Sequence, residues 1–314
     1  MVQVYTEPLC RRHYSSLFGE AVICRLSILA ISIALSLVVS YSTGGFWVKL
    51  KPDITQASVH YTYDAILVFE GNDIGQEMIW TSSPSINTEF GSKYVAATVQ
   101  ASEQDLNFDG KPDIIEFTAT VAGAYPVYGV KALLQFTYVL KGGPLNLEMH
   151  SLAYLTHSSQ LPGAVLYTDG ELVLQQKNAL TFGRYNDLFN QPMLSSAAPS
   201  VFTATQPSIQ YEFQKILGSY LARNYTTLYT NNHPVWKAGN SDTFTLSMRI
   251  RIPPNQLVYY RPMVIEMLKG GWIQFLATFA VLWFLLSWAE VMIFKYRIVS
   301  TRVASDLVQK LHKF

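Results

Sequence analysis

The chain has 314 residues, of which 49% are hydrophobic and 14% are charged, and its formal net charge at pH 7 is +1. This balance provides no excess of basic residues for binding nucleic acid, so a nucleic-acid partner is not expected. The low charged fraction reflects two long apolar stretches, one near each end of the chain.

Both apolar stretches have the length of membrane spans. Residues 26–47 contain no charged side chain, and residues 271–294 contain only Glu290. As helices, stretches of about 22 residues cover about 33 Å, enough to cross a bilayer core of about 30 Å. A cleaved signal peptide is the alternative for the first stretch, but its apolar run is longer than a typical signal core. The predicted division is an N-terminal tail (1–25), a first transmembrane helix (26–47), a central domain (48–270), a second transmembrane helix (271–294) and a C-terminal tail (295–314).

The side of the membrane that each part occupies is predicted from basic residues and a glycosylation sequon. Lys and Arg are more numerous beside the tail ends of the two spans than beside their domain ends, so the positive-inside rule places both termini in the cytoplasm. The sequon Asn224-Tyr225-Thr226 lies in the central domain and agrees with a lumenal or extracellular position. We therefore expect a multi-pass membrane glycoprotein, with Asn224 as the glycosylation site.

The central domain has the sequence pattern of a β-rich fold. Residues 243–252 alternate apolar and polar side chains, which is typical of a strand with one buried face. Gly142-Gly143 and Asp169-Gly170 each separate two β-prone segments and predict tight hairpin turns. A helix is expected after Ser208, which would cap it, with an apolar face that reaches Leu221. Many antiparallel strands joined by short turns predict a sandwich-like domain.

One loop of this domain has the spacing of calcium ligands. A glycine at position 110 permits the sharp turn, and strands rather than helices are expected on both sides, with Glu116 on the solvent face of the second. The alternative is a polar turn that binds no metal. The candidate ligands are the side chains of Asp105, Asn107, Asp109 and Asp113 and the backbone carbonyl of Lys111.

No set of residues in the sequence suggests catalysis. The chain has no H-E-x-x-H metal motif, no G-x-S-x-G nucleophile elbow and no Walker-type glycine loop, and its six histidines are scattered. We therefore expect a protein that is not an enzyme and that has no cofactor other than the candidate calcium ion.

Polar residues in the spans and in the C-terminal tail suggest contacts. Ser32, Ser36 and Ser40 recur every fourth residue, so they line one helix face and permit close helix approach. The alternative is that their hydroxyls bond back to their own helix. Glu290 lies close enough to Lys295 and Arg297 for pairing near the cytoplasmic interface. In the tail, residues 299–314 carry apolar side chains every fourth position, which predicts either a partner-binding helix or a frayed end.

Four short stretches together resemble one known family. The stretches are Gly45-Phe46-Trp47-Val48-Lys49, the loop from Asp105 to Asp113, Leu172-Val173-Leu174-Gln175-Gln176-Lys177, and Arg223-Asn224-Tyr225-Thr226-Thr227 followed by Pro234-Val235-Trp236. Through them the chain is similar to the transmembrane protein 231 family of ciliary transition-zone proteins over essentially its whole length. The resemblance implies a membrane component of the Meckel-syndrome-type complex at the base of the cilium, with tectonic-type and other transition-zone proteins as partners and a role as a diffusion barrier.

Two other functional classes share parts of this plan. A two-span channel or receptor subunit with a large ectodomain has the same topology, but such ectodomains are often rich in disulfides. Here the two cysteines, Cys10 and Cys24, both precede the central domain. A lumenal enzyme anchored at both ends is the second alternative, and the missing catalytic residues argue against it.

Overall fold

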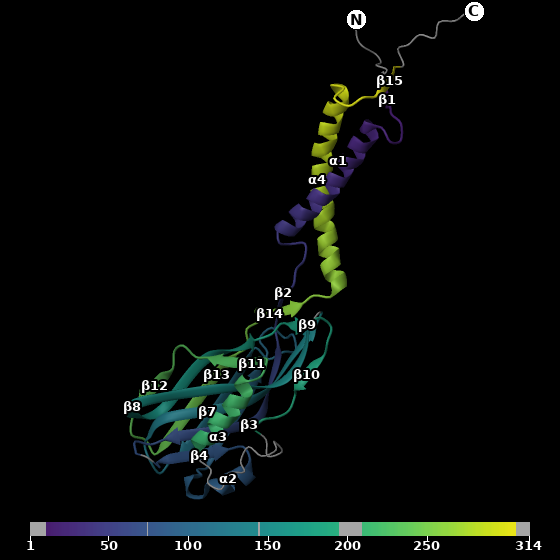
Figure 1. Ribbon diagram of the computed structural model, residues 1–314. Coiled ribbons are helices and arrows are strands. Elements are labelled where there is room, and N and C mark those ends of the chain that lie inside the picture. Colours follow the sequence, from purple (N-terminus) through teal and green to yellow (C-terminus); the bar gives the residue numbers. More distant parts are fainter. Residues whose placement is uncertain (1–10, 74, 144, 195–208, 306–314) are drawn as a thin grey trace, which may run out of the picture. The chain divides into compact units, whose positions relative to one another are not determined.

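The computed structural model describes residues 11–73, 75–143, 145–194 and 209–305. The chain divides into two compact units (Figure 1). One unit combines the two ends of the chain, Met1–Lys49 and Met263–Phe314, and the other is the central segment Leu50–Pro262.

The unit of chain ends contains two long helices and a small sheet. Its elements are β1 (Arg11–Tyr14), α1 (Glu20–Ser42), α4 (Val264–Lys295) and β15 (Arg302–Ser305). Both helices begin before the apolar stretches that predicted them, at Glu20 rather than at residue 26 and at Val264 rather than at residue 271. The difference arises because helical hydrogen bonding continues through the charged residues that precede the apolar stretches, such as Arg25 in α1 and Lys269 in α4. At 32 residues, α4 is about 48 Å long and exceeds the bilayer core.

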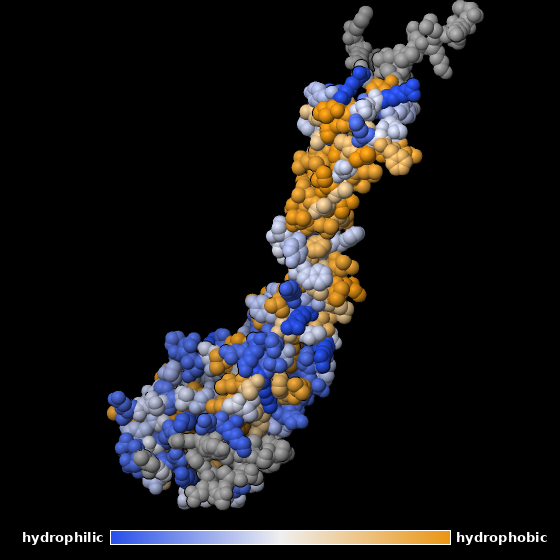
Figure 2. All heavy atoms as spheres, viewed as in Figure 1, coloured by the Kyte–Doolittle hydropathy of each residue, from blue (hydrophilic) through white to orange (hydrophobic). Residues whose placement is uncertain are grey.

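The two helices expose their apolar side chains and bury small polar ones. In α4, Phe284 is 65% exposed and Trp288 is 68% exposed, whereas Ser32, Ser36 and Ser40 of α1 are fully buried. Figure 2 shows the resulting apolar surface along the helix pair. A water-soluble helix pair would have the reverse arrangement, so the predicted membrane spans are confirmed as helices suited to lipid.

The segments that flank the helix pair form a two-stranded antiparallel sheet. β1 pairs with β15, with Arg12 opposite Ala304 and Tyr14 opposite Arg302. Because β1 precedes α1 and β15 follows α4, both flanking segments lie at the same end of the helix pair (Figure 1). The predicted tail helix is wrong for residues 302–305, which form this strand, and residues 306–314 lie outside the described residues.

The central unit is β-rich. A ten-stranded sheet has the order β4-β3-β7-β8-β13-β6-β5, with β10, β11 and β12 also paired to β8, and a three-stranded sheet has the order β2-β14-β9. The elements are β2 (Lys51–Thr55), β3 (Ser58–Glu70), β4 (Glu77–Thr81), α2 (Pro84–Phe90), a 3-10 turn (Gly91–Lys93), β5 (Ala97–Gln104), β6 (Ile114–Ala122), β7 (Val127–Gly142), β8 (Leu145–Gln176), β9 (Leu180–Thr181), β10 (Asn186–Phe189), α3 (Ile209–Leu221), β11 (Tyr225–Thr230), β12 (Val235–Ala238), β13 (Thr243–Arg251) and β14 (Gln256–Arg261).

The large sheet folds over one core. The 32-residue strand β8 pairs with β7 along its first part and with β13 and β11 along its second part. The Tyr61 ring of β3 lies 5.7 Å from the Phe117 ring of β6, although four hydrogen-bonded steps separate these strands in the sheet. The two halves therefore face each other, which confirms the predicted sandwich-like domain.

The predicted hairpin at Asp169-Gly170 is wrong, because β8 continues through it without a break. A Cβ added to Gly170 would lie 2.5 Å from the carbonyl oxygen of Thr230, so the glycine permits the close approach of β11 rather than a turn. The hairpin at Gly142-Gly143 is confirmed between β7 and β8, with a φ of +54° at Gly143. The expected antiparallel pairing is only partial, since β13 runs parallel to β8.

Helix α3 packs against the sheet through a separate apolar cluster. Phe213, Ile216 and Tyr220 are buried against residues of β7 and β8, including Leu133. The expected apolar face does not include Leu221, which is 57% exposed. The proposed cap, Ser208, lies outside the described residues.

Candidate functional site

The loop between β5 and β6 is closed by its own side chains. Asp105 accepts hydrogen bonds from the backbone N–H of Phe108 through Oδ1 and from that of Gly110 through Oδ2, both at 2.8 Å. Asn107 and Asp109 each accept one from the backbone two residues later, at 2.9 Å. These Asx-type turns stabilise the loop without a bound ion, and a cation here would have to share these oxygens with the backbone.

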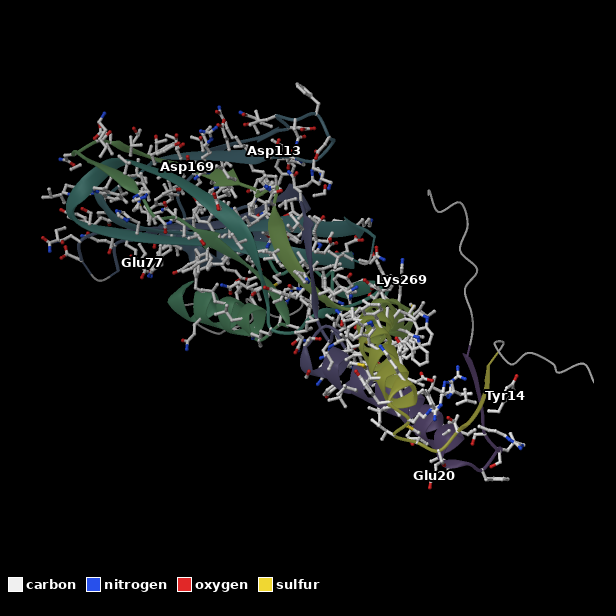
Figure 3. All side chains as sticks on the ribbon, turned by 90° about the horizontal axis from the view of Figure 1, so that it is seen from above. Tyr14, Glu20, Glu77, Asp113, Asp169 and Lys269 are labelled. Carbon is white, nitrogen blue, oxygen red and sulfur yellow. The ribbon has the colours of Figure 1, made fainter. Side chains whose placement is uncertain are left out.

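The end of this loop is anchored to the chain before β3. Asp113, labelled in Figure 3, accepts hydrogen bonds from the Leu106 N–H at 2.8 Å and from the Gln56 side chain at 2.7 Å. The Lys111 ammonium donates to the Gln56 carbonyl at 3.1 Å. Glu116 lies in β6, and its carboxylate is 3.8 Å from Nε of Arg249 on β13.

The predicted ligands therefore all lie in one loop between two strands, β5 and β6. Among the described residues, no group of three or more His, Cys, Asp or Glu side chains has the arrangement of a metal site. Calcium binding by this loop stays a prediction.

Asn224, the acceptor residue of the sequon, lies on the surface of the central unit, whereas Tyr225 and Thr226 are buried. Asn224 is exposed in the bend between α3 and β11, and its Oδ1 accepts a hydrogen bond from Asn178 Nδ2 at 3.1 Å. Thr226, the third residue of the sequon, lies in β11. The position suits an enzyme that modifies exposed asparagine, and glycosylation of Asn224 stays a prediction.

Beside the sequon, a buried tyrosine joins α3 to two strands. Tyr220 is 2% exposed, and its hydroxyl oxygen accepts hydrogen bonds from the backbone N–H of Leu152 at 3.2 Å and of Thr227 at 2.5 Å. The Thr227 hydroxyl donates to the Leu152 carbonyl at 2.9 Å. Both backbone groups of Leu152 are thus satisfied by side chains, and burial raises the pKa of Tyr220.

Arg223, next to the sequon, is held in a defined position. Its guanidinium lies over the rings of Phe189 and Tyr220, at 5.1 and 5.6 Å from their centroids, and donates to the His150 carbonyl at 3.2 Å. Burial lowers the pKa of Arg223. No local pattern in the sequence predicts these contacts, because Leu152, Phe189 and His150 are distant in sequence from Tyr220 and Arg223.

A buried polar cluster lies near the same surface. Gln135 is fully buried, donates to Asp64 Oδ2 at 2.9 Å and accepts a hydrogen bond from the Leu194 N–H at 3.0 Å. Burial raises the pKa of Asp64 and lowers the pKa of His150, in both cases by disfavouring the charged form. The buried Nδ1 of His150 has no hydrogen-bond partner among the described residues.

The two helices of the other unit pack through small polar side chains. Ser40 Oγ lies 2.7 Å from Thr278 Oγ1 of α4, whereas Ser32 and Ser36 donate to carbonyls of their own helix, at 2.7 and 2.8 Å. Both interpretations of the serine pattern therefore apply. The serines are buried at the helix contact, and two of the three also bond back to α1.

A glycine pair permits close packing after α1. A Cβ added to Gly271 of α4 would lie 2.9 Å from the carbonyl oxygen of Phe46, and one added to Gly45 would lie 2.0 Å from the Gln274 side chain. The stretch Gly45-Phe46 thus packs directly on α4, which gives a physical reason for the first stretch of the family resemblance.

The acidic residue of the second span pairs across the helices. Glu290 Oε1 is 3.4 Å from Nε of Arg25 in α1. Among the described ion pairs, this contact takes the place of the expected pairing with Lys295 or Arg297, since α1 and α4 pack directly against each other.

These features define a class, a membrane protein whose two antiparallel spans precede and follow a large β-rich domain in the sequence. The profile of the family described as Transmembrane protein 231 matches residues 1–303, so the chain belongs to that family. A protein named Transmembrane protein 231 from Xenopus tropicalis is 29% identical over 100% of this chain and 98% of its own. The proteins of that name from Homo sapiens and Bos taurus are 26% and 28% identical, each over 96% of this chain and 94% of their own.

Among solved structures, the chain is similar to a cryo-EM structure of a proton-activated chloride channel, with 8% sequence identity, a TM-score of 0.24, and coverage of 86% of this chain and 97% of that chain. A score this low does not indicate a shared architecture.

Proposed function

We propose that this protein is a structural membrane component of the Meckel-syndrome-type complex at the ciliary transition zone. In this role it contributes to the diffusion barrier between the plasma and ciliary membranes, and so to ciliogenesis and ciliary signalling. The observation that carries the proposal is the match of the Transmembrane protein 231 family to residues 1–303. The partners are other transition-zone proteins, including tectonic-type membrane proteins, together with the bilayer itself.

The form of the molecule supports a positional rather than a catalytic role. A barrier requires subunits that are anchored firmly and present a broad surface to neighbours. Two spans packed through Ser40 and Thr278 anchor the chain at both ends of its domain. In the domain, Tyr220 and Arg223 fix the surface around Asn224 by buried contacts rather than leaving it mobile.

The test measures the barrier directly. In ciliated cells that lack the protein, a ciliary membrane receptor should leak out of the cilium or fail to accumulate, and the full-length chain should restore its enrichment. A matched variant that lacks residues 50–262 but keeps both spans should reach membranes and fail to restore it. Normal receptor enrichment in the null cells would refute the proposal, and a diffuse plasma-membrane signal with an ionic current would favour a channel subunit.

The proposed topology places both termini in the cytoplasm and the central unit outside. Endoglycosidase should then shift the gel mobility of the wild-type protein but not of an Asn224→Gln variant. An Asn178→Gln variant is the matched control, because it changes the neighbouring amide and leaves the sequon intact. Protease protection of the tags on both tails, together with digestion of the central unit, is expected in intact cells. The reverse pattern would overturn the topology.

A further inference from the structure

A cavity of about 1000 Å³ lies within the unit of chain ends, where α1 and α4 meet β1 and β15. Its lining comes from all four elements, and Tyr14, labelled in Figure 3, belongs to it. The volume is at the upper end of the range for sites that hold a small organic ligand. The cavity belongs to neither the calcium-type loop nor the sequon surface.

One wall of the cavity is apolar and includes side chains exposed on the surface of the helices. Leu26, Leu29, Trp283 and Phe294 line it. Leu26 is 59% exposed and Leu29 is 39% exposed, so this wall opens toward the surroundings of the helices. A fully water-soluble ligand would gain nothing from this wall, whereas an acyl chain would cover it.

The charged side chains of the lining are mainly basic. The lining contains one acidic side chain, Glu290, and that carboxylate faces Arg25 at 3.4 Å. Lys295 and Arg297 are two further cations in the lining. His13 Nδ1, also in the lining, shares a hydrogen bond with Thr301 Oγ1 at 2.9 Å. The lining therefore combines two positive charges in excess with apolar side chains.

The backbone of Arg297 indicates that its side chain is needed here. Arg297 follows the end of α4 with a φ of +53°, a left-handed conformation that usually takes glycine. The N–H groups of Arg297 and Ile298 close the helix end by hydrogen bonds to the carbonyls of Phe294 and Ile293, at 3.2 and 3.1 Å. Glycine would form this turn without strain, so the turn itself does not require arginine. Strain of this kind in a residue that lines a cavity points to a function of the side chain.

We propose that this cavity is a binding site for one anionic phospholipid. The headgroup phosphate lies between Lys295 and Arg297, and an acyl chain runs along Leu29 and Trp283. Arginine and lysine are suited to bind phosphate oxygens, and basic pockets between spans are a known form of site for anionic lipid headgroups. The lipid comes from the leaflet on the side of β1 and β15. This site is independent of the proposed barrier function.

The test uses the full-length chain purified in detergent, with lipid binding measured by native mass spectrometry. Phosphatidylserine is compared with phosphatidylcholine of the same acyl chains. The wild type should prefer phosphatidylserine, and each cation removed should weaken its binding roughly fivefold. Arg297→Gly keeps the turn and removes the charge, so it should fold and lose affinity, and Lys295→Gln should add to the loss. Lys269→Gln removes a cation from the opposite end of α4 and is the matched control, with no expected change.

A second variant tests the cavity without changing its charge. Leu29→Trp should fill the apolar wall and displace the lipid, while circular dichroism confirms that the helices remain. Unchanged phosphatidylserine binding in Arg297→Gly, Lys295→Gln and Leu29→Trp would overturn the proposal. Competition by inorganic phosphate as strong as that by the lipid would overturn the lipid assignment. A protein dimer that excludes lipid would show that a second copy fills the cavity instead.

Discussion

Replacing Tyr220 by phenylalanine tests how the sequon surface is held in place. The change keeps the ring and removes the hydroxyl oxygen that accepts from the N–H groups of Leu152 and Thr227. Each buried donor left without an acceptor costs about 1–3 kcal/mol, so the expected loss of stability is roughly 3 kcal/mol. For a domain of 150–250 residues, a loss of this size lowers the melting temperature by about 6–12 °C.

The assay is thermal unfolding of the full-length protein in detergent, followed by tryptophan fluorescence, with hydrogen exchange of peptides from β8 and β11 as a local readout. Tyr259→Phe is the matched control, because that side chain is 49% exposed and its loss should shift the melting temperature little. Thr227→Val should also destabilise, and the double variant should cost less than the sum because the two side chains share one network. A shift below about 2 °C with unchanged exchange at β8 would refute the reasoning about unsatisfied donors.

Three further outcomes are expected. Millimolar calcium should raise the melting temperature of the wild type, because a ligand that binds the folded state stabilises it, and Asp109→Ala should abolish this effect. Equal melting temperatures of the wild type with calcium and with chelator would show that the loop is a turn that binds no calcium. The pKa of His150 in the folded state lies below its ordinary value of 6.5, so the unfolded chain takes up a proton first as the pH falls. The free energy of unfolding should therefore decline on acidification below about pH 6.5, and His150→Gln should flatten that decline. The same pH dependence in this variant would contradict the assignment of the decline to His150. Gly271→Leu should force Phe46 away from α4 and lower the yield of a disulfide between cysteines placed at Ser40 and Thr278. Gly270→Leu should leave that yield unchanged, because a Cβ added at Gly270 meets nothing within 4 Å.

Much of the architecture was predictable because it depends on local patterns. Uninterrupted apolar stretches predict the two spans, since a bilayer requires a minimum length of apolar helix. Alternation along residues 243–252 predicts β13, because a strand between a core and solvent must alternate. The loop from Asp105 to Asp113 was also placed correctly between two strands, since its turn is formed by neighbouring residues.

The errors arose where long-range contacts overrode a local signal. Asp169-Gly170 has the composition of a turn, but Asp169 lies 3.0 Å from Arg251 on β13, and Gly170 permits the approach of β11. The helix limits also differed from the apolar stretches, because hydrogen bonding rather than hydropathy ends a helix.

The sequence by itself determined the two spans, the β-rich domain and the family resemblance. Only the tertiary structure decided which side chains meet: Tyr220 with Leu152 and Thr227, Glu290 with Arg25, and the basic cavity formed when β1 pairs with β15. The reason is physical. Hydropathy and turn chemistry act between near neighbours, whereas these contacts exist only after the chain has folded, and their energy depends on burial that no local pattern records.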